Sequence, residues 1–348
     1  MHQPEHDPSK RTPVIANADE LIGAIPYLIR VRPHRSLILL AGNASSSTNI
    51  LSATTSLPTA EHALAAAREL RLSLAHAIDH VWTHHGELID TGSLIVVDDS
   101  NNPLPHRAFI DALTAELGDT GITIPHSLWT PIARPGEIWH CYDPCRCRGV
   151  TADMSTSTLA VQLTVDGITV ADSRDQLAAT LGPSQPERLA ARAALIHKRQ
   201  TDEPRDGDSV DAAIQAVDSA IAAASTQPDL PNLVDDQIAD LAAALAQPRV
   251  RDHCLAVAIS DQAEAAQRLW TTLARETPAP HRDVPLVLLG IDAYLRSNVT
   301  YANVAFELAL DANPDNFLAG RLLKASHAGI PPTLLRQLLT EALDLPGR

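Results

Sequence analysis

The chain has 348 residues, enough for two domains, and its 45% apolar content is typical of a globular protein with a buried core. Acidic residues outnumber basic residues 42 to 27, which gives a formal charge of −15. This balance argues against nucleic acid as a partner, because a phosphate backbone is bound through clustered Lys and Arg and no basic cluster stands out.

The N-terminal residues are polar and contain prolines at positions 4, 8 and 13, so they do not resemble a signal peptide or an anchor. No apolar run reaches the roughly 18 residues that a membrane-spanning helix needs. We therefore expect a cytoplasmic protein without membrane association. In that compartment its four cysteines are expected to be reduced thiols or metal ligands.

Residues 1–14 are expected to form a flexible tail, and residues 15–199 an α/β domain. Asn17 is placed to cap a helix, inside which Pro26 predicts a kink or an early stop. The nearly continuous apolar run at 36–41 predicts a strand that is buried on both faces.

A long helix follows at 59–85, where Leu64, Leu74 and Trp82 are expected on one buried arc. A weaker strand pattern precedes this helix at 50–57, and residues 94–97 after it predict another buried strand. Further strand patterns lie at 121–124 with 128–132 and at 137–142. Strands that alternate with helices predict a mostly parallel or mixed sheet with helices packed on it.

A charged segment at 200–208 is the predicted linker to an all-helical domain, 209–348. Within it, residues 283–316 resemble one tetratricopeptide repeat, with small residues at 290, 302 and 309, Phe306 and a closing Pro314. Small residues let two helices approach closely. Neighbouring helices are expected to stack into a short solenoid, whose concave face suits a protein or peptide partner.

The order of several segments is specific, namely LIGAIPYLIRVRPHRSLILL, VVDD, IWHCYDPCRCRG, VADSRDQLAATL, QRLWTTLAR and LALDANPDNFLAGRLL. In this order they resemble the actinobacterial family known as domain of unknown function 4192. The resemblance covers nearly all of residues 16–335. It implies the two-part architecture and a bacterial cytoplasmic setting, but it assigns no activity and gives no residue a role.

Three cysteines and a histidine lie close together in the WHCYDPCRCRG segment: His140, Cys141, Cys145 and Cys147. Thiolates and imidazole are the ligand types that tetrahedral zinc prefers, so these four residues are the candidate zinc site. Because His140 adjoins Cys141, the more distant His126 is an alternative fourth ligand. The other interpretation is a loop with free or redox-active thiols.

Asp98 and Asp99 directly follow the predicted strand at 94–97. Ligands of open α/β sheets bind at the carboxyl ends of strands, so the paired carboxylates are a candidate ligand or magnesium site. The same residues are also typical of a solvated turn that leads into a helix.

The chain has no Walker loop and no GxGxxG, GxSxG or HExxH motif, so it lacks the usual signatures of several enzyme classes. The leading hypothesis is therefore a binding or scaffolding module that acts through its helical domain and is not an enzyme. One alternative is an enzyme with a site near Asp98, Asp99 or the cysteine cluster. Another is a structural zinc site without chemistry.

Overall fold

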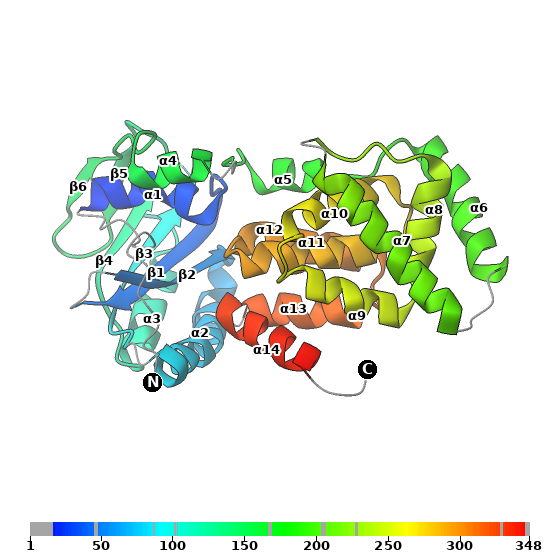
Figure 1. Ribbon diagram of the computed structural model, residues 1–348. Helices are drawn as coiled ribbons and strands as arrows, with labels where there is room; N and C mark the ends of the chain where they lie inside the picture. Colours follow the sequence, from blue (N-terminus) through cyan, green and yellow to red (C-terminus); the bar gives the residue numbers. More distant parts are fainter. Residues whose placement is uncertain are drawn as a thin grey trace. The chain divides into compact units, whose positions relative to one another are not determined.

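A computed structural model of the chain describes residues 17–44, 48–85, 88–100, 102, 104–165, 169–202, 207–226, 229–327 and 330–344. The chain divides into two compact units, one ending at Ser173 and the other beginning at Arg174. The first unit contains the sheet, and the second is helical (Figure 1). Among the described residues, no helix is both long and apolar enough to cross a lipid bilayer.

The first unit is built on one mixed sheet with the strand order β2-β1-β3-β4-β5-β6. Strands β3 and β4 are parallel, and every other neighbouring pair is antiparallel. The strands are β1 (Ser36–Asn43), β2 (Thr48–Ser56), β3 (Thr91–Val97), β4 (Thr123–Thr130), β5 (Ile138–Cys141) and β6 (Arg148–Val150). Of the two predicted arrangements, the mixed sheet is therefore confirmed, and the sheet is not mostly parallel.

Helices cover both faces of the central strands (Figure 1). Alternate side chains of β1 explain this, because Leu37 and Leu39 pack in one apolar cluster while Ile38 and Leu40 pack in the other. The helices of the first cluster are α2 (Ala63–His85) and α3 (Arg107–Gly118). The other cluster contains α1 (Ala18–Ile29), against which α4 (Thr158–Val165) packs.

Helix α1 begins as predicted, because the Asn17 side chain accepts a hydrogen bond from the Glu20 N–H at 3.0 Å. The predicted early stop near Ile25 is wrong, since the helix continues through Pro26 to Ile29. Helix α2 also departs from its predicted pattern. Leu74 is buried, but Leu64 and Trp82 are 65% and 57% exposed, so the buried arc is narrower than the sequence indicated.

The second unit begins earlier in the chain than the predicted linker. Its helices are α5 (Arg174–Thr180), α6 (Pro186–Asp202), α7 (Gly207–Ser225), α8 (Asp235–Leu245), α9 (Pro248–Val257), α10 (Ala263–Glu276), α11 (Asp283–Leu295), α12 (Val299–Ala312), α13 (Phe317–His327) and α14 (Pro332–Asp344). Buried Arg192 of α6 bonds to Asp235 at 2.8 Å, and Arg174 of α5 bonds to Glu307 at 2.6 Å. These contacts explain why α5 and α6 join the helical unit, although the sequence placed residues up to 199 with the sheet.

Helix α11 is the centre of the second unit. Every residue of α11 except Val284 is buried, including Asp283 and Asp292, and the rest of the helix is almost entirely apolar. It packs against α10 and α12, and also against α9 and α14. The hairpin of α11 and α12 forms as predicted, because Phe306, Ala302 and Ala309 are fully buried.

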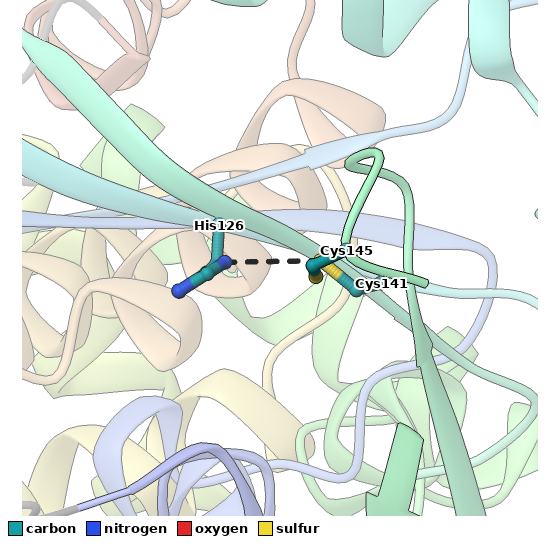
Figure 2. Close-up of side chains that lie close together, drawn as sticks. All are labelled: His126, Cys141 and Cys145. Carbon is teal, nitrogen blue, oxygen red and sulfur yellow. Dashed lines mark hydrogen bonds between the residues drawn. The ribbon is translucent and has the colours of Figure 1, made fainter. Parts of the chain in front are cut away.

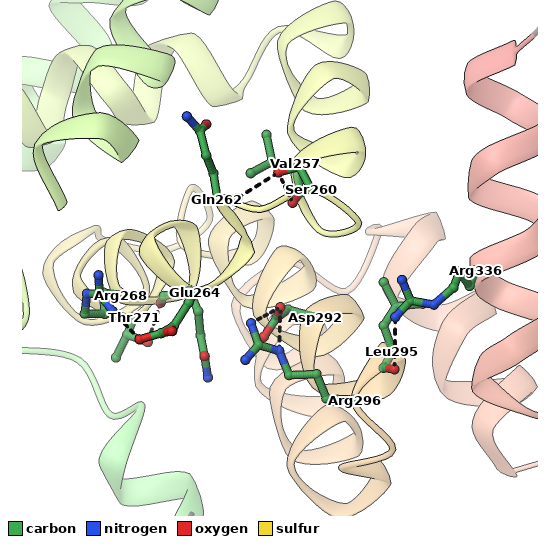
Figure 3. Close-up of polar contacts among 11 residues, drawn as sticks. Val257, Ser260, Gln262, Glu264, Arg268, Thr271, Asp292, Leu295, Arg296 and Arg336 are labelled. Carbon is green, nitrogen blue, oxygen red and sulfur yellow. Dashed lines mark hydrogen bonds and ion pairs between the residues drawn. The ribbon is translucent and has the colours of Figure 1, made fainter. Parts of the chain in front are cut away.

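Helix α14 covers a face of α11 that the solenoid hypothesis left open. Figure 3 shows Arg336 of α14 donating a hydrogen bond to the Leu295 carbonyl oxygen at 3.5 Å. The Tyr294 hydroxyl donates to the carbonyl oxygen of Ile330, just before α14. The same helix also contacts α9. Within the described residues, part of α11 is therefore covered by α14.

Candidate metal centre

The cysteine cluster lies in the hairpin that joins β5 to β6. Cys141 is the last residue of β5, and its N–H donates to the Cys147 carbonyl oxygen at 2.9 Å. A tight turn between them is closed by the Arg146 N–H and the Asp143 carbonyl oxygen at 3.0 Å. The hairpin therefore brings both ends of the CxxxCxC segment together, with Cys145 at the turn.

His126 joins two of these cysteines from the neighbouring strand β4. In the β4–β5 ladder Leu128 pairs with Cys141, and His126 lies two residues before Leu128, so all three side chains point to one face. The Nδ1 atom of His126 is 3.8 Å from Sγ of Cys141. Ligand atoms of His126, Cys141 and Cys145 all lie within 4.8 Å of one another (Figure 2).

His140 does not belong to this group, which corrects the predicted ligand set. Because side chains alternate along β5, His140 and Cys141 point to opposite faces of the sheet. The His140 ring stacks on Trp129, with 5.6 Å between ring centroids. Trp129 packs in the cluster of α2 and α3, whereas Cys141 packs in the cluster of α1. The alternative ligand, His126, is the histidine that the structure brings to the thiols.

Asp143 adds a carboxylate beside the three donors. Its Oδ2 atom accepts hydrogen bonds from the Ser127 N–H and from the Cys141 thiol, both at 3.0 Å. The same atom is 3.8 Å from Nδ1 of His126. Asp143 thus holds β4 against the hairpin and orients the Cys141 thiol. Asp143 is not among the residues predicted from the sequence, although its position two residues after Cys141 was a usable signal.

The three thiols differ in how readily they lose a proton. Burial and the hydrogen bond to Asp143 raise the pKa of Cys141 to about 12. Hydrogen bonds from the thiol and the backbone N–H of Cys147 lower the pKa of exposed Cys145. The Cys147 thiol donates a hydrogen bond to Cys145, and this raises the pKa of Cys147. Cys145 is therefore the thiol of this cluster that is most readily a thiolate.

The distances fit a soft divalent ion. A tetrahedral zinc with usual bond lengths holds sulfur and imidazole nitrogen about 3.6 Å apart, and two sulfurs about 3.8 Å apart. The observed separation of Cys141 Sγ and His126 Nδ1 is 3.8 Å. Cys145 lies within 4.8 Å of both, so small side-chain rotations complete a three-donor set. Cys147 is hydrogen-bonded to Cys145 and is not one of these three converging donors.

Asp98 and Asp99 lie at the carboxyl end of β3, as predicted, but their carboxylates are bound separately. The buried Asp98 carboxylate is 3.1 Å from Nε2 of His106 and 3.9 Å from Nε of Arg35. Asp99 is exposed and lies 3.5 Å from Nε2 of His34. The Asp98 carboxylate therefore already has partners within the protein. Among the described residues, neither aspartate belongs to a group of three potential metal ligands.

The alternative enzyme hypothesis required the aspartates and the cysteines to converge. Instead, Tyr142 and Arg107 link the cysteine hairpin to the segment at the start of α3. The Tyr142 hydroxyl donates to the Pro105 carbonyl oxygen, and Arg107 donates to the Tyr142 carbonyl oxygen at 3.0 Å. His106, the partner of Asp98, lies between Pro105 and Arg107 in the chain. Asp98 thus supports the loop that borders the cysteine hairpin, and it does not line the same pocket.

Comparison with known proteins gives a family and no function. No curated protein and no solved structure matches the chain. One family model matches residues 19–333, which include the whole cysteine hairpin and the helices from α5 to α13. The chain belongs to the family described as Domain of unknown function (DUF4192).

Proposed function

We propose that the first unit is a zinc-binding domain in which His126, Cys141 and Cys145 hold the ion. The observation that carries the proposal is the convergence of one imidazole nitrogen and two thiols within 4.8 Å from three different segments of chain. Thiolate and imidazole together select zinc over the harder ions that carboxylates and water prefer.

The role proposed for the ion is structural. His126 lies on β4, Cys141 ends β5, and Cys145 lies in the turn before β6, so the ion would tie three segments at one edge of the sheet. Strands β5 and β6 are short and contribute few ladder hydrogen bonds. Metal ligation contributes directly to folding free energy at such a site. With Cys147 as the fourth donor, the coordination would be closed, as in structural zinc sites.

A zinc site of this kind requires a reducing compartment, because disulfide formation would remove the thiolate ligands. The proposal therefore includes the cytoplasmic location that the sequence predicts. All four cysteines are free thiols in the structure. Binding of a protein partner through the helical unit remains a prediction from the sequence. Metal binding is favoured over it because α14 covers α11, the central helix of the expected concave face.

We also propose that the hairpin of α11 and α12 is a single unit of tetratricopeptide type that serves internal packing. Its support is the close approach of the two helices at Gly290, where the Phe306 ring fills the space that a side chain would need. Helices α10 and α13 flank the pair, as neighbouring helices do in a repeat.

Metal content per chain tests the zinc proposal. The protein is purified under reducing conditions, loaded with zinc, dialysed and measured by mass spectrometry for the wild type, His126→Ala, Cys145→Ser and His140→Ala. We expect about one zinc per chain in the wild type and in His140→Ala, and loss of the ion in the other two. His140→Ala is the matched control, because His140 adjoins Cys141 but faces the other side of the sheet.

Two results would overturn the proposal. One is a wild type that retains no zinc after loading, which would leave the three thiols as a metal-free loop. The other is equal loss of zinc in His126→Ala and His140→Ala. A further variant, Cys147→Ser, reports on the fourth ligand, since weaker zinc retention than in the wild type is expected if Cys147 closes the coordination sphere.

A further inference from the structure

A pocket of about 570 Å³ opens beside the cysteine hairpin, and neither the sequence analysis nor the zinc proposal accounts for it. Its walls come from two parts of the chain, the start of α3 and residues 140–147. This volume is within the range of about 300–1,000 Å³ that is typical of small-molecule sites. The pocket is therefore large enough for a small metabolite.

Two arginines line this pocket, Arg107 from α3 and Arg146 from the turn of the hairpin. Arg107 is held in place, because it donates to the Tyr142 carbonyl oxygen at 3.0 Å and lies over the Tyr142 ring, 5.5 Å from its centroid. Its Nη1 atom is 3.8 Å from exposed Asp111, beyond hydrogen-bond distance. A fixed guanidinium with a donor left over is well suited to a carboxylate or phosphate.

One carboxylate offsets part of this positive charge. Asp143 is the one carboxylate among the described lining residues, and its Oδ2 atom accepts from the Ser127 N–H and the Cys141 thiol. His140 adds an imidazole whose ring is held by stacking on Trp129. With two arginines and one aspartate, the lining has an excess of positive charge in a chain whose formal charge is −15, and this local excess would attract an anion.

The backbone around the pocket is unusual as well. Leu104 and Arg146, which both line it, have φ values of +62° and +50°, and His106 beside them has +58°. Residues other than glycine rarely adopt this region, and such positions cluster at ligand sites because the surrounding structure holds them there. Arg146, one of the two arginines in the lining, is among the residues with this backbone conformation.

We infer that this pocket binds a small molecule through an oxyanion group, a phosphate or a carboxylate, which Arg107 and Arg146 would hold between them. Neither arginine is a proposed zinc ligand, so this pocket does not require the ion. Cys141 and Cys147 also contribute to its lining.

The test is calorimetric titration of the full-length protein with inorganic phosphate and, separately, with acetate, at constant ionic strength. We expect saturable binding of phosphate to the wild type, weakened about tenfold in Arg146→Gln, because one charge-assisted contact is lost. Arg148→Gln is the matched control, since this exposed arginine lies two residues further along and does not line the pocket. Saturable binding of acetate as well would extend the ligand class to carboxylates, and phosphate binding alone would restrict it to phosphates.

The oxyanion proposal is overturned by a wild type that shows saturable binding of neither phosphate nor acetate. It is also overturned if Arg148→Gln weakens binding as much as Arg146→Gln, because the attraction would then be non-specific. His126→Ala separates this proposal from the zinc site. Phosphate binding that persists in His126→Ala supports a pocket independent of the ion, whereas loss of phosphate binding in this variant would show that the ion, not the arginines, holds the anion.

Discussion

Gly290 of α11 lies directly against the ring of Phe306 of α12. A Cβ atom built on Gly290 would meet three ring atoms of Phe306, with Cδ1 at 2.6 Å and Cζ at 2.9 Å. Phe306 is fully buried and has no free space to move into. The absence of a side chain at Gly290 therefore sets the distance between the two helices at the centre of the second unit.

Gly290→Ala should destabilise the protein, although alanine is the better helix former. Overpacking costs about 1–3 kcal/mol, which exceeds the gain of about 1 kcal/mol in helix propensity. Chemical unfolding of the variant measures the difference. Gly320→Ala is the matched control in α13, because its nearest contact is Leu310 at 4.0 Å, and it should be neutral or stabilising. Recovery in Gly290→Ala with Phe306→Leu would identify the ring as the cause, and an unchanged Gly290→Ala would contradict the packing argument.

Arg192→Met should lower the free energy of unfolding of the second unit by about 2 kcal/mol at pH 7. This loss is smaller than that expected when a fully buried ion pair is broken, because the two acidic partners of Arg192 are partly exposed. Arg192 is completely buried and bonds to Asp235 and to Glu276. Arg188→Met is the control, since Arg188 is half exposed and lies 3.9 Å from the same Asp235. Equal losses of stability in the two variants would contradict the assignment.

The effect of Arg192→Met should depend on pH. Burial raises the pKa of Glu276, but hydrogen bonds from Arg192 and Ser184 outweigh it, so the net pKa is lowered. A carboxyl whose pKa is lower in the folded state contributes stability above its unfolded pKa of about 4.3 and loses it as the pH falls through the folded value. The stability difference between wild type and Arg192→Met should therefore narrow below about pH 4, as urea titrations at several pH values would show.

Asp98→Ala should destabilise the first unit by about 1–3 kcal/mol, because it leaves the partly buried His106 without the carboxylate that it contacts. The control is Asp99→Ala, which should change stability little, since Asp99 is exposed. Thermal unfolding with and without magnesium checks the competing hypothesis at the same time. A magnesium-dependent rise in melting temperature that both variants lose would restore the paired carboxylates as a metal site.

Alkylation of the metal-free protein should separate the cysteines by position. Cys145 and Cys147 are exposed and should react with a maleimide in the native state, whereas Cys254 is buried in α9 and burial raises its pKa to about 12. Peptide mass spectrometry should find Cys254 modified only after unfolding in urea. Zinc should slow the modification of Cys145. Native labelling of Cys254 would show that α9 opens readily.

Several features of the fold were predictable because they depend on local chemistry. The Asn17 cap needs only the side chain and the next turn of helix. The run at 36–41 predicts burial on both faces, and β1 is covered on both. The small residue at 290 and the ring at 306 predict a close helix pair, because both lie within one hairpin.

Other features were decided by contacts between distant parts of the chain. His140 adjoins Cys141, so the sequence favoured it as a ligand, but strand alternation turns the two side chains to opposite faces. The β4–β5 ladder instead places His126 beside Cys141. Arg192 of α6 bonds to Asp235 and to the Glu276 carbonyl oxygen, which lie far along the chain, and these bonds hold α6 in the helical unit. Sequence patterns indicate which residues are buried or need a polar partner. Strand pairing and helix packing determine which residue becomes that partner.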